Sequence, residues 1–136
     1  CERLNVRESD GATRLAAREI ITSCVREDLA FTVRYLEQAH DINGEPPHPR
    51  LVVSLVEEIM GQKKLRTLRQ RPLEAGRMQG VEVQAEGNDS GKQAWIRGFL
   101  VGTDVYILLA LGDARDIFER GEVQDFFFSF NLDVVP

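Results

Sequence analysis

The sequence predicts an α+β domain built on a mostly antiparallel, twisted β-sheet with helices packed on it. Segments of alternating polar and apolar residues are joined by turns too short for parallel crossovers, and one segment among them has the apolar spacing of an amphipathic helix. Hydrophobic residues make up 43% of the chain and charged residues 29%, as in ordinary globular domains, which excludes disordered and collagen-like classes. The length of 136 residues fits a single domain spanning residues 1–136.

Three strands are expected at the N-terminal end, over residues 3–7, 15–24 and 31–36. The first alternates polar and apolar residues, which is typical of a half-buried strand, and the second is rich in Ile, Thr and Ala. A turn containing Gly11 follows the first strand, and a short charged turn at residues 26–28 follows the second. Because these connections are short, we expect an antiparallel meander.

A helix is predicted directly after the proline-rich loop at residues 41–49. Pro49 suits a first helical turn and Gly61 suits the C-terminal cap, so the helix should span residues 49–60. Since valine is a poor helix former, packing against the sheet must stabilise this helix. Its apolar side chains recur along one side, at Leu51, Val52, Leu55, Val56, Ile59 and Met60.

Four further strands are predicted after the helix. Residues 65–73 are ambiguous, with strand favoured, whereas residues 81–86 alternate cleanly between apolar and polar side chains. Residues 93–101 return after a glycine-rich hairpin loop. Residues 105–111 are apolar on both faces, as expected of a central strand that is covered on each side.

The chain is expected to close with a helical region and a last strand. Residues 113–127 have the apolar spacing of a helix, interrupted at Gly121, and residues 128–134 are predicted to form the final strand. Ser129 should hydrogen-bond within that strand's part of the sheet. From the apolar positions of all these elements we expect burial of Phe31, Val33, Leu55, Ile59, Trp95, Tyr106, Leu108, Phe127 and Phe130.

The C-terminal half also carries motifs of a known family. They are the hairpin strand at residues 93–102, the tyrosine-containing strand that follows it, and the closing run at residues 126–132. Phe126, Ser129 and Phe130 match a Phe-x-x-Ser-Phe-x-hydrophobic ending. This half resembles the PsbP-like domains, a fold shared by photosystem II extrinsic subunits, a Ran-binding nuclear-import factor and many bacterial lipoproteins. The resemblance implies a PsbP-like α+β fold and a non-catalytic module that binds a protein complex, without a cofactor.

No pattern in the sequence identifies catalytic residues. It contains no nucleophile elbow, P-loop or dinucleotide-binding glycine pattern. His40 and His48 flank the proline-rich loop, with Glu37, Asp41 and Glu45 nearby, so the alternative function is a small-ligand or metal-binding domain, or an enzyme, that uses this loop. Because the prolines stiffen the loop rather than spacing ligands by helical turns, we favour a solvated loop and predict no metal ligands.

The two cysteines leave several alternatives open. Cys24 lies beside Arg26, which would activate a nucleophilic thiol, but a lone cysteine in a strand is more often a small core residue. A disulfide between Cys1 and Cys24 is the third alternative. Cys1 also resembles the lipid-bearing residue of a processed lipoprotein, although a domain boundary is favoured. The localisation is therefore cytoplasmic or, with a lipidated Cys1, extracytoplasmic and membrane-anchored. No run of ~20 apolar residues predicts a transmembrane segment.

The most uneven charge in the chain lies at residues 61–71. This segment holds no acidic residue and carries +5, although the net charge of the whole chain is −5. We predict that it binds a protein partner with an acidic surface. Nucleic acid is disfavoured because no aromatic residues lie between the basic ones. The structural alternative is a solvated rim whose charges suit the helix end. The oligomeric state stays open. The predicted binding residues are Lys63, Lys64, Arg66, Arg69 and Arg71.

Overall fold

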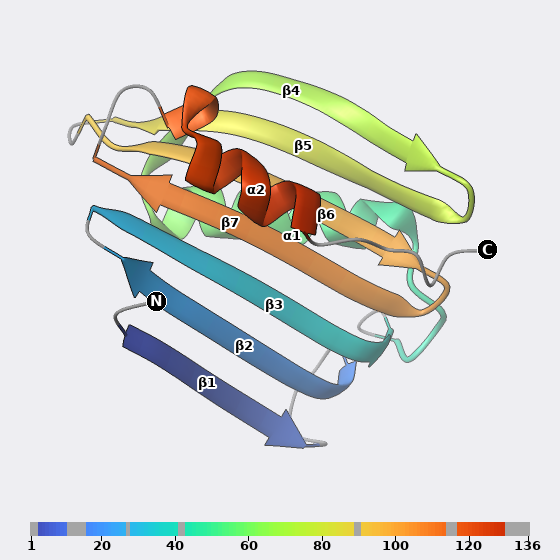
Figure 1. Ribbon diagram of the computed structural model, residues 1–136. Coiled ribbons are helices and arrows are strands. Elements are labelled where there is room, and N and C mark those ends of the chain that lie inside the picture. Colours follow the sequence, from blue (N-terminus) through green and yellow to red (C-terminus); the bar gives the residue numbers. More distant parts are fainter. Residues whose placement is uncertain are drawn as a thin grey trace.

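The computed structural model describes residues 3–10, 16–26, 28–40, 43–88, 91–113 and 117–129 (Figure 1). In the described part of the chain, the strands form a seven-stranded antiparallel sheet in the order β1-β2-β3-β7-β6-β5-β4. The elements are β1 (Arg3–Asp10), β2 (Ala16–Arg26), β3 (Leu29–Ala39), α1 (Pro49–Gln62), β4 (Leu65–Ala75), β5 (Met78–Gly87), β6 (Gln93–Val101), β7 (Asp104–Gly112), the 3-10 helix η1 (Ile117–Glu119) and α2 (Gly121–Ser129).

Two antiparallel meanders make up this sheet. Strands β1 to β3 form the first meander and strands β4 to β7 the second, and α1 lies between the two in sequence. The two meanders meet where β3 pairs with β7, with Phe31 opposite Ala110 and Tyr35 opposite Tyr106. Strand β7 is therefore central, and most of its residues are buried, which confirms the prediction for residues 105–111.

The two helices lie on opposite faces of the sheet (Figure 1). Helix α1 packs on β5, β6 and β7 through Val52, Leu55 and Val56, and α2 covers part of the other face. Gly98 on β6 permits the close approach of α1, because a methyl group there would lie 2.6 Å from Val52 Cγ1. These layers confirm a sheet-dominated α+β fold. Within the described segments, no helix has the length and apolar character needed to cross a membrane.

The core has two parts, one on each face of the sheet. The part under α1 is aliphatic, whereas the part under α2 is built around Trp95 and Phe127. Phe130 lies outside the described residues. Among the other predicted core residues, four are buried, namely Leu55, Trp95, Leu108 and Phe127. The remaining four are only partly buried and pack against the two clusters, namely Phe31, Val33, Ile59 and Tyr106.

Helix α1 begins at Pro49, as predicted, and extends beyond its predicted end. His48 is the N-cap, and its Nδ1 accepts the backbone N–H of Arg50 at 3.1 Å. Gly61, the predicted cap, lies inside the helix, so that prediction was wrong. The C-cap is Lys63, and the left-handed conformation falls at Lys64, with a φ of 53°, where the chain turns into β4.

Replacing Gly61 by alanine should raise the free energy of unfolding by about 0.5–1 kcal/mol, since glycine is unfavourable inside a helix. The added methyl group meets no atom within 4 Å. Chemical denaturation measures the change, and Gly98→Ala is the control, because its methyl group would clash with α1 and should destabilise the fold. A loss of stability in Gly61→Ala would show that this residue does cap the helix.

The C-terminal helical region ends later than predicted. The predicted interruption falls one residue earlier, at Arg120 between η1 and α2, and Gly121 is the first residue of α2. Helix α2 continues through Ser129, so the predicted strand at residues 128–134 was wrong at its start, and Ser129 does not lie in the sheet. The rest of that range lies outside the described residues. Val123 and Phe127 are one helical turn apart and both are buried, which favours the helix.

Candidate interaction surface

An irregularity in β4 gathers its arginines on one face of the sheet. Strand β4 is an edge strand, and Arg66, Arg69 and Arg71 lie opposite alternate residues of β5, which share a face. In a regular strand, residues 66 and 69 would point to opposite faces. The register shifts between Thr67 and Arg69, so the extra residue, Leu68, brings the arginines back into alignment. We call Arg66, Arg69 and Arg71 the basic ridge.

Carboxylates of β5 hold two of the ridge arginines in place. Arg66 pairs with Glu86, and Nε of Arg71 donates to Oε1 of Glu82 at 2.8 Å. The side chains of Arg66 and Arg71 nevertheless remain 65% and 50% exposed, so each guanidinium keeps N–H donors for a partner. Within the described segments, Arg69 is exposed and has no ion-pair partner.

Glu82 connects the ridge to the core under α2. Its carboxylate is only 4% exposed and accepts hydrogen bonds from Arg71 and from Nε of Arg97 at 2.5 Å. Burial acts to raise the pKa of Glu82, but the two arginines outweigh burial, and this pKa lies below its ordinary value. The guanidinium of Arg97 in turn lies 5.1 Å from the ring centroids of Trp95 and Phe127. The base of the ridge is therefore fixed to packed aromatic side chains.

The two lysines of the predicted site do not join the ridge. Lys63 lines a hollow of about 350 Å³ on the α1 face, together with Glu58 and Gln62 of α1 and Arg34 of β3. Lys64 is exposed in the turn before β4. The structure therefore brings together three of the five predicted basic residues and places Lys63 toward the opposite face of the sheet.

The edge position of β4 gives its arginines a second explanation. An exposed edge strand presents unpaired backbone groups, and proteins protect such edges with charged side chains, prolines and bulges. Strand β4 has all three devices, in its arginines, in Pro72 and in the bulge at Leu68. Charges of either sign would protect an edge, however, so edge protection alone does not account for their uniform sign. All the charged side chains between residues 63 and 71 are positive.

The histidines that define the alternative site lie next to the ends of two elements, His40 after β3 and His48 before α1. The Nδ1 atom of His48 caps α1 by accepting the N–H of Arg50. His40 is partly buried directly after β3, and Asp41 lies outside the described residues. Across the described ranges, no group of three or more His, Cys, Asp and Glu side chains is placed to hold a metal ion.

Cys24 is disulfide-bonded rather than a free thiol, so its interpretation as a nucleophile was wrong. The residue is partly buried on β2, where it lies opposite Phe31 of β3. Cys1 lies outside the described residues.

Two residues of the surface, Glu82 and Arg97, were not predicted from the sequence. The alternation around Glu82 places its side chain on the sheet face opposite that of its valine neighbours. This pattern predicts the face of Glu82 but not its partner. Its contact with Arg97, fifteen residues later, depends on the register of β5 against β6, which the sequence pattern left undetermined.

The fold and the surface together define a sheet-dominated α+β domain with an exposed basic ridge on one edge strand. No protein-family model matches the chain, and no curated protein matches it.

Proposed function

We propose that this chain is a non-catalytic protein-interaction module, similar to PsbP-like domains, that docks on an acidic surface of its partner through the basic ridge. The observation that carries the proposal is the bulge at Leu68, which aligns Arg66, Arg69 and Arg71 on one face of an exposed edge. The PsbP-like part of this proposal is supported by the sequence resemblance of the C-terminal half.

The geometry of the ridge suits carboxylate recognition. Arginine presents planar N–H donors that match a carboxylate in pairs, and Glu82 and Glu86 fix two guanidinium groups without covering them. Arg69, which has no carboxylate partner in the described segments, offers a full set of donors between these two. The ridge thus combines two positioned arginines with one free arginine.

Charge distribution selects an acidic protein over nucleic acid. The chain outside the basic segment is strongly acidic and would repel an extended polyanion. The residues between the ridge arginines are Thr67, Leu68 and Gln70, which provide no aromatic surface for base stacking. A compact acidic patch on a protein can meet the ridge without approaching the rest of the domain.

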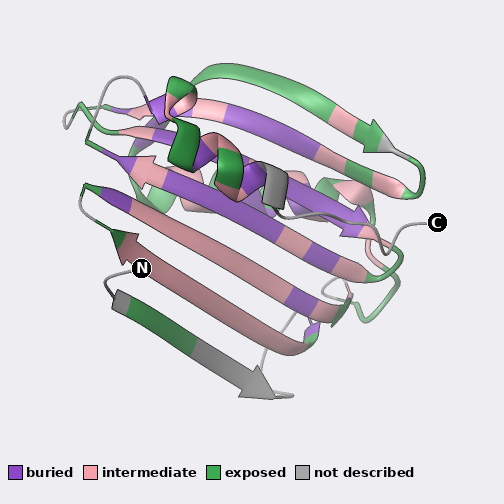
Figure 2. Cartoon of the chain, in the orientation of Figure 1, coloured by how far each residue is buried: buried purple, intermediate pink, exposed green. Residues whose placement is uncertain are grey.

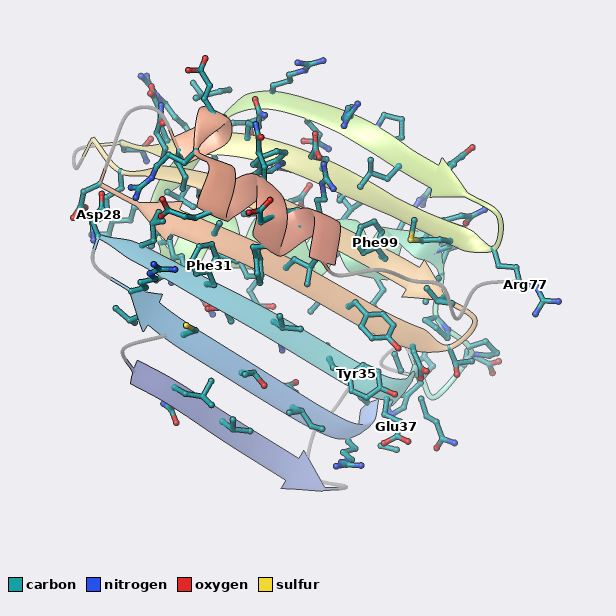
Figure 3. The ribbon with its side chains drawn as sticks, viewed as in Figure 1. Asp28, Phe31, Tyr35, Glu37, Arg77 and Phe99 are labelled. Atoms are coloured by element: carbon teal, nitrogen blue, oxygen red, sulfur yellow. The ribbon has the colours of Figure 1, made fainter. Side chains whose placement is uncertain are left out.

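A decaglutamate peptide is the probe that tests this surface. Its affinity for the full chain should fall as salt rises, and Arg69→Glu should weaken it about fivefold, because exposed ion pairs each contribute modestly and reversal adds repulsion. Fluorescence anisotropy of labelled peptide measures both effects. Arg77→Glu is the matched control, because Arg77 is an exposed arginine in the β4–β5 turn that points away from the sheet (Figure 3).

Equal weakening by Arg69→Glu and Arg77→Glu would mean that only the total charge matters, and the ridge would then serve edge protection alone. Affinity that does not change with salt would likewise contradict electrostatic docking. Circular dichroism of each variant separates these outcomes from loss of the fold, which is not expected because both arginines are exposed.

A further inference from the structure

Mostly apolar side chains continue from the core under α2 across β3, β2 and β1, beyond the part of this face that α2 covers in the described residues. The strand register aligns them in two rows across the sheet. One row runs Ala110, Phe31, Cys24 and Leu4, and the other runs Leu108, Val33, Thr22 and Val6. Each row begins buried at β7, becomes partly buried at β3 and β2, and ends exposed at β1 (Figure 2).

These rows form the floor of a groove whose wall is α2. The groove has a volume of about 360 Å³. Thr22, Cys24, Arg26, Phe31 and Val33 line it from the sheet, and Phe126 lines it from the helix. The rings of Phe31 and Phe126 lie 4.8 Å apart, and Figure 3 shows Phe31 beside α2. Beyond the groove, Leu4 and Val6 are 67% and 55% exposed. A contiguous apolar surface of this kind marks an interaction site.

The width of the surface beside α2 fits one helix. Helices packed side by side on a sheet lie about 8–10 Å apart, which corresponds to about two strand spacings of 4.8 Å. Helix α2 packs through Val123 and Phe127 in the cluster that includes residues of β6 and β7. A neighbouring helix on the same face would therefore lie along β2 and β3, where the two rows pass.

The charge on the rim of the groove determines which charged residues the bound helix should carry beside α2. Glu122 and Asp125 lie one turn apart on α2 and both line the groove. Arg26, the last residue of β2, lines the groove from the sheet, so the acidic charge belongs to the α2 side alone. Glu122 already pairs with Arg120 at 2.9 Å, whereas Asp125 is exposed and has no ion-pair partner in the described segments. A basic side chain facing α2 would complete this rim, and an acidic one would be repelled.

We propose that this groove binds an amphipathic helix of a partner protein, with its apolar side on the two rows and lysine or arginine along the edge that faces α2. The binding mode is a helix laid in an apolar groove. This surface is separate from the basic ridge and has the opposite preference for charge, so it goes beyond the function proposed above.

Three synthetic peptides, each about four helical turns long, test the proposal with the full chain. The first has leucine on one side and lysine along the flank, the second has glutamate in place of lysine, and the third has the composition of the first in an order with no apolar side. Fluorescence anisotropy should show that the first binds roughly tenfold more tightly than either of the others.

Substitutions then locate the binding site. Val6→Lys should weaken the lysine-flanked peptide roughly tenfold, while Leu68→Lys, at an exposed apolar residue on the opposite edge strand, should leave its affinity within about twofold. Asp125→Lys should invert the preference between the lysine-flanked and glutamate-flanked peptides. Arg69→Glu should not weaken peptide binding, which separates a failure of this inference from a failure of the basic ridge.

Equal binding of the ordered and scrambled peptides would overturn the proposal, as would unchanged affinity in a folded Val6→Lys variant. Sedimentation velocity tests the other possible occupant of the groove, which is a second copy of the chain. If the chain self-associates, and Val6→Lys abolishes this while no peptide binds, the groove is covered by a second copy, and the partner helix is excluded.

Discussion

Replacing Phe127 by alanine should lower the free energy of unfolding by about 3–5 kcal/mol, the range found for phenylalanine removed from a packed core. Phe127 is 4% exposed and is one of the residues through which α2 contacts the aromatic cluster. Its ring centroid lies 4.7 Å from that of Trp95 and 5.0 Å from that of Phe126. Alanine would remove these contacts together with the aromatic face beneath Arg97.

Urea denaturation of Phe127→Ala and Phe127→Leu measures this effect with its control. Leucine keeps most of the apolar volume, so it should cost less than about half as much as alanine. If Phe127→Ala unfolds at nearly the same urea concentration as the parent, α2 is not held on the sheet by this residue, and the wall of the proposed groove would need another explanation.

Replacing Arg97 by alanine should lower the free energy of unfolding by about 3 kcal/mol, because it leaves the buried carboxylate of Glu82 with only one ion-pair partner. The remaining partner, Arg71, is 50% exposed, so we expect the lower end of the range for broken buried pairs. The loss of the contacts between Arg97 and the rings of Trp95 and Phe127 acts in the same direction.

The same ion-pair cluster predicts how stability depends on pH. The pKa of Glu82 in the folded protein lies below its ordinary value of 4.5, so the unfolded chain binds this proton more readily. The stabilisation is therefore complete above pH 4.5 and is lost as pH falls through the folded pKa. Glu82→Gln should flatten this acidic limb of the stability curve, while Glu57→Gln, at an exposed residue of α1, should not. If the free energy of unfolding falls equally steeply at low pH in both variants, the role of Glu82 is contradicted.

Most of the fold follows from local patterns in the sequence. Alternation identified β1 and β5, and the apolar spacing identified α1, because both patterns reflect which side of an element is buried. The pattern over β4 was ambiguous, with strand favoured, and the run that forms β7 is apolar on both faces. The secondary structure of the run at residues 126–128 was harder to predict, since consecutive phenylalanines fit a strand and a helix equally well. Burial of Val123 and Phe127 decides for the helix, and that burial depends on distant strands.

The surfaces were less accessible to sequence reasoning. The excess of positive charge at residues 61–71 was visible, but the division of Lys63 from the arginines depends on the turn at Lys64 and on the bulge at Leu68. The sequence shows no separate signal for that bulge. The apolar groove was missed for the same reason, because its two rows gather residues from four strands and become continuous only when the register is known.

The most direct test of the docking proposal is to map where the decaglutamate peptide binds by NMR. Titration into ¹⁵N-labelled protein should shift the backbone amide signals of residues 66–71 and of the facing residues of β5, with the largest changes around Arg69. The signals of α1 near Lys63, on the other face of the sheet, should change little. Shifts centred on the α1 end at Lys63, or spread evenly over the domain, would contradict docking through the basic ridge.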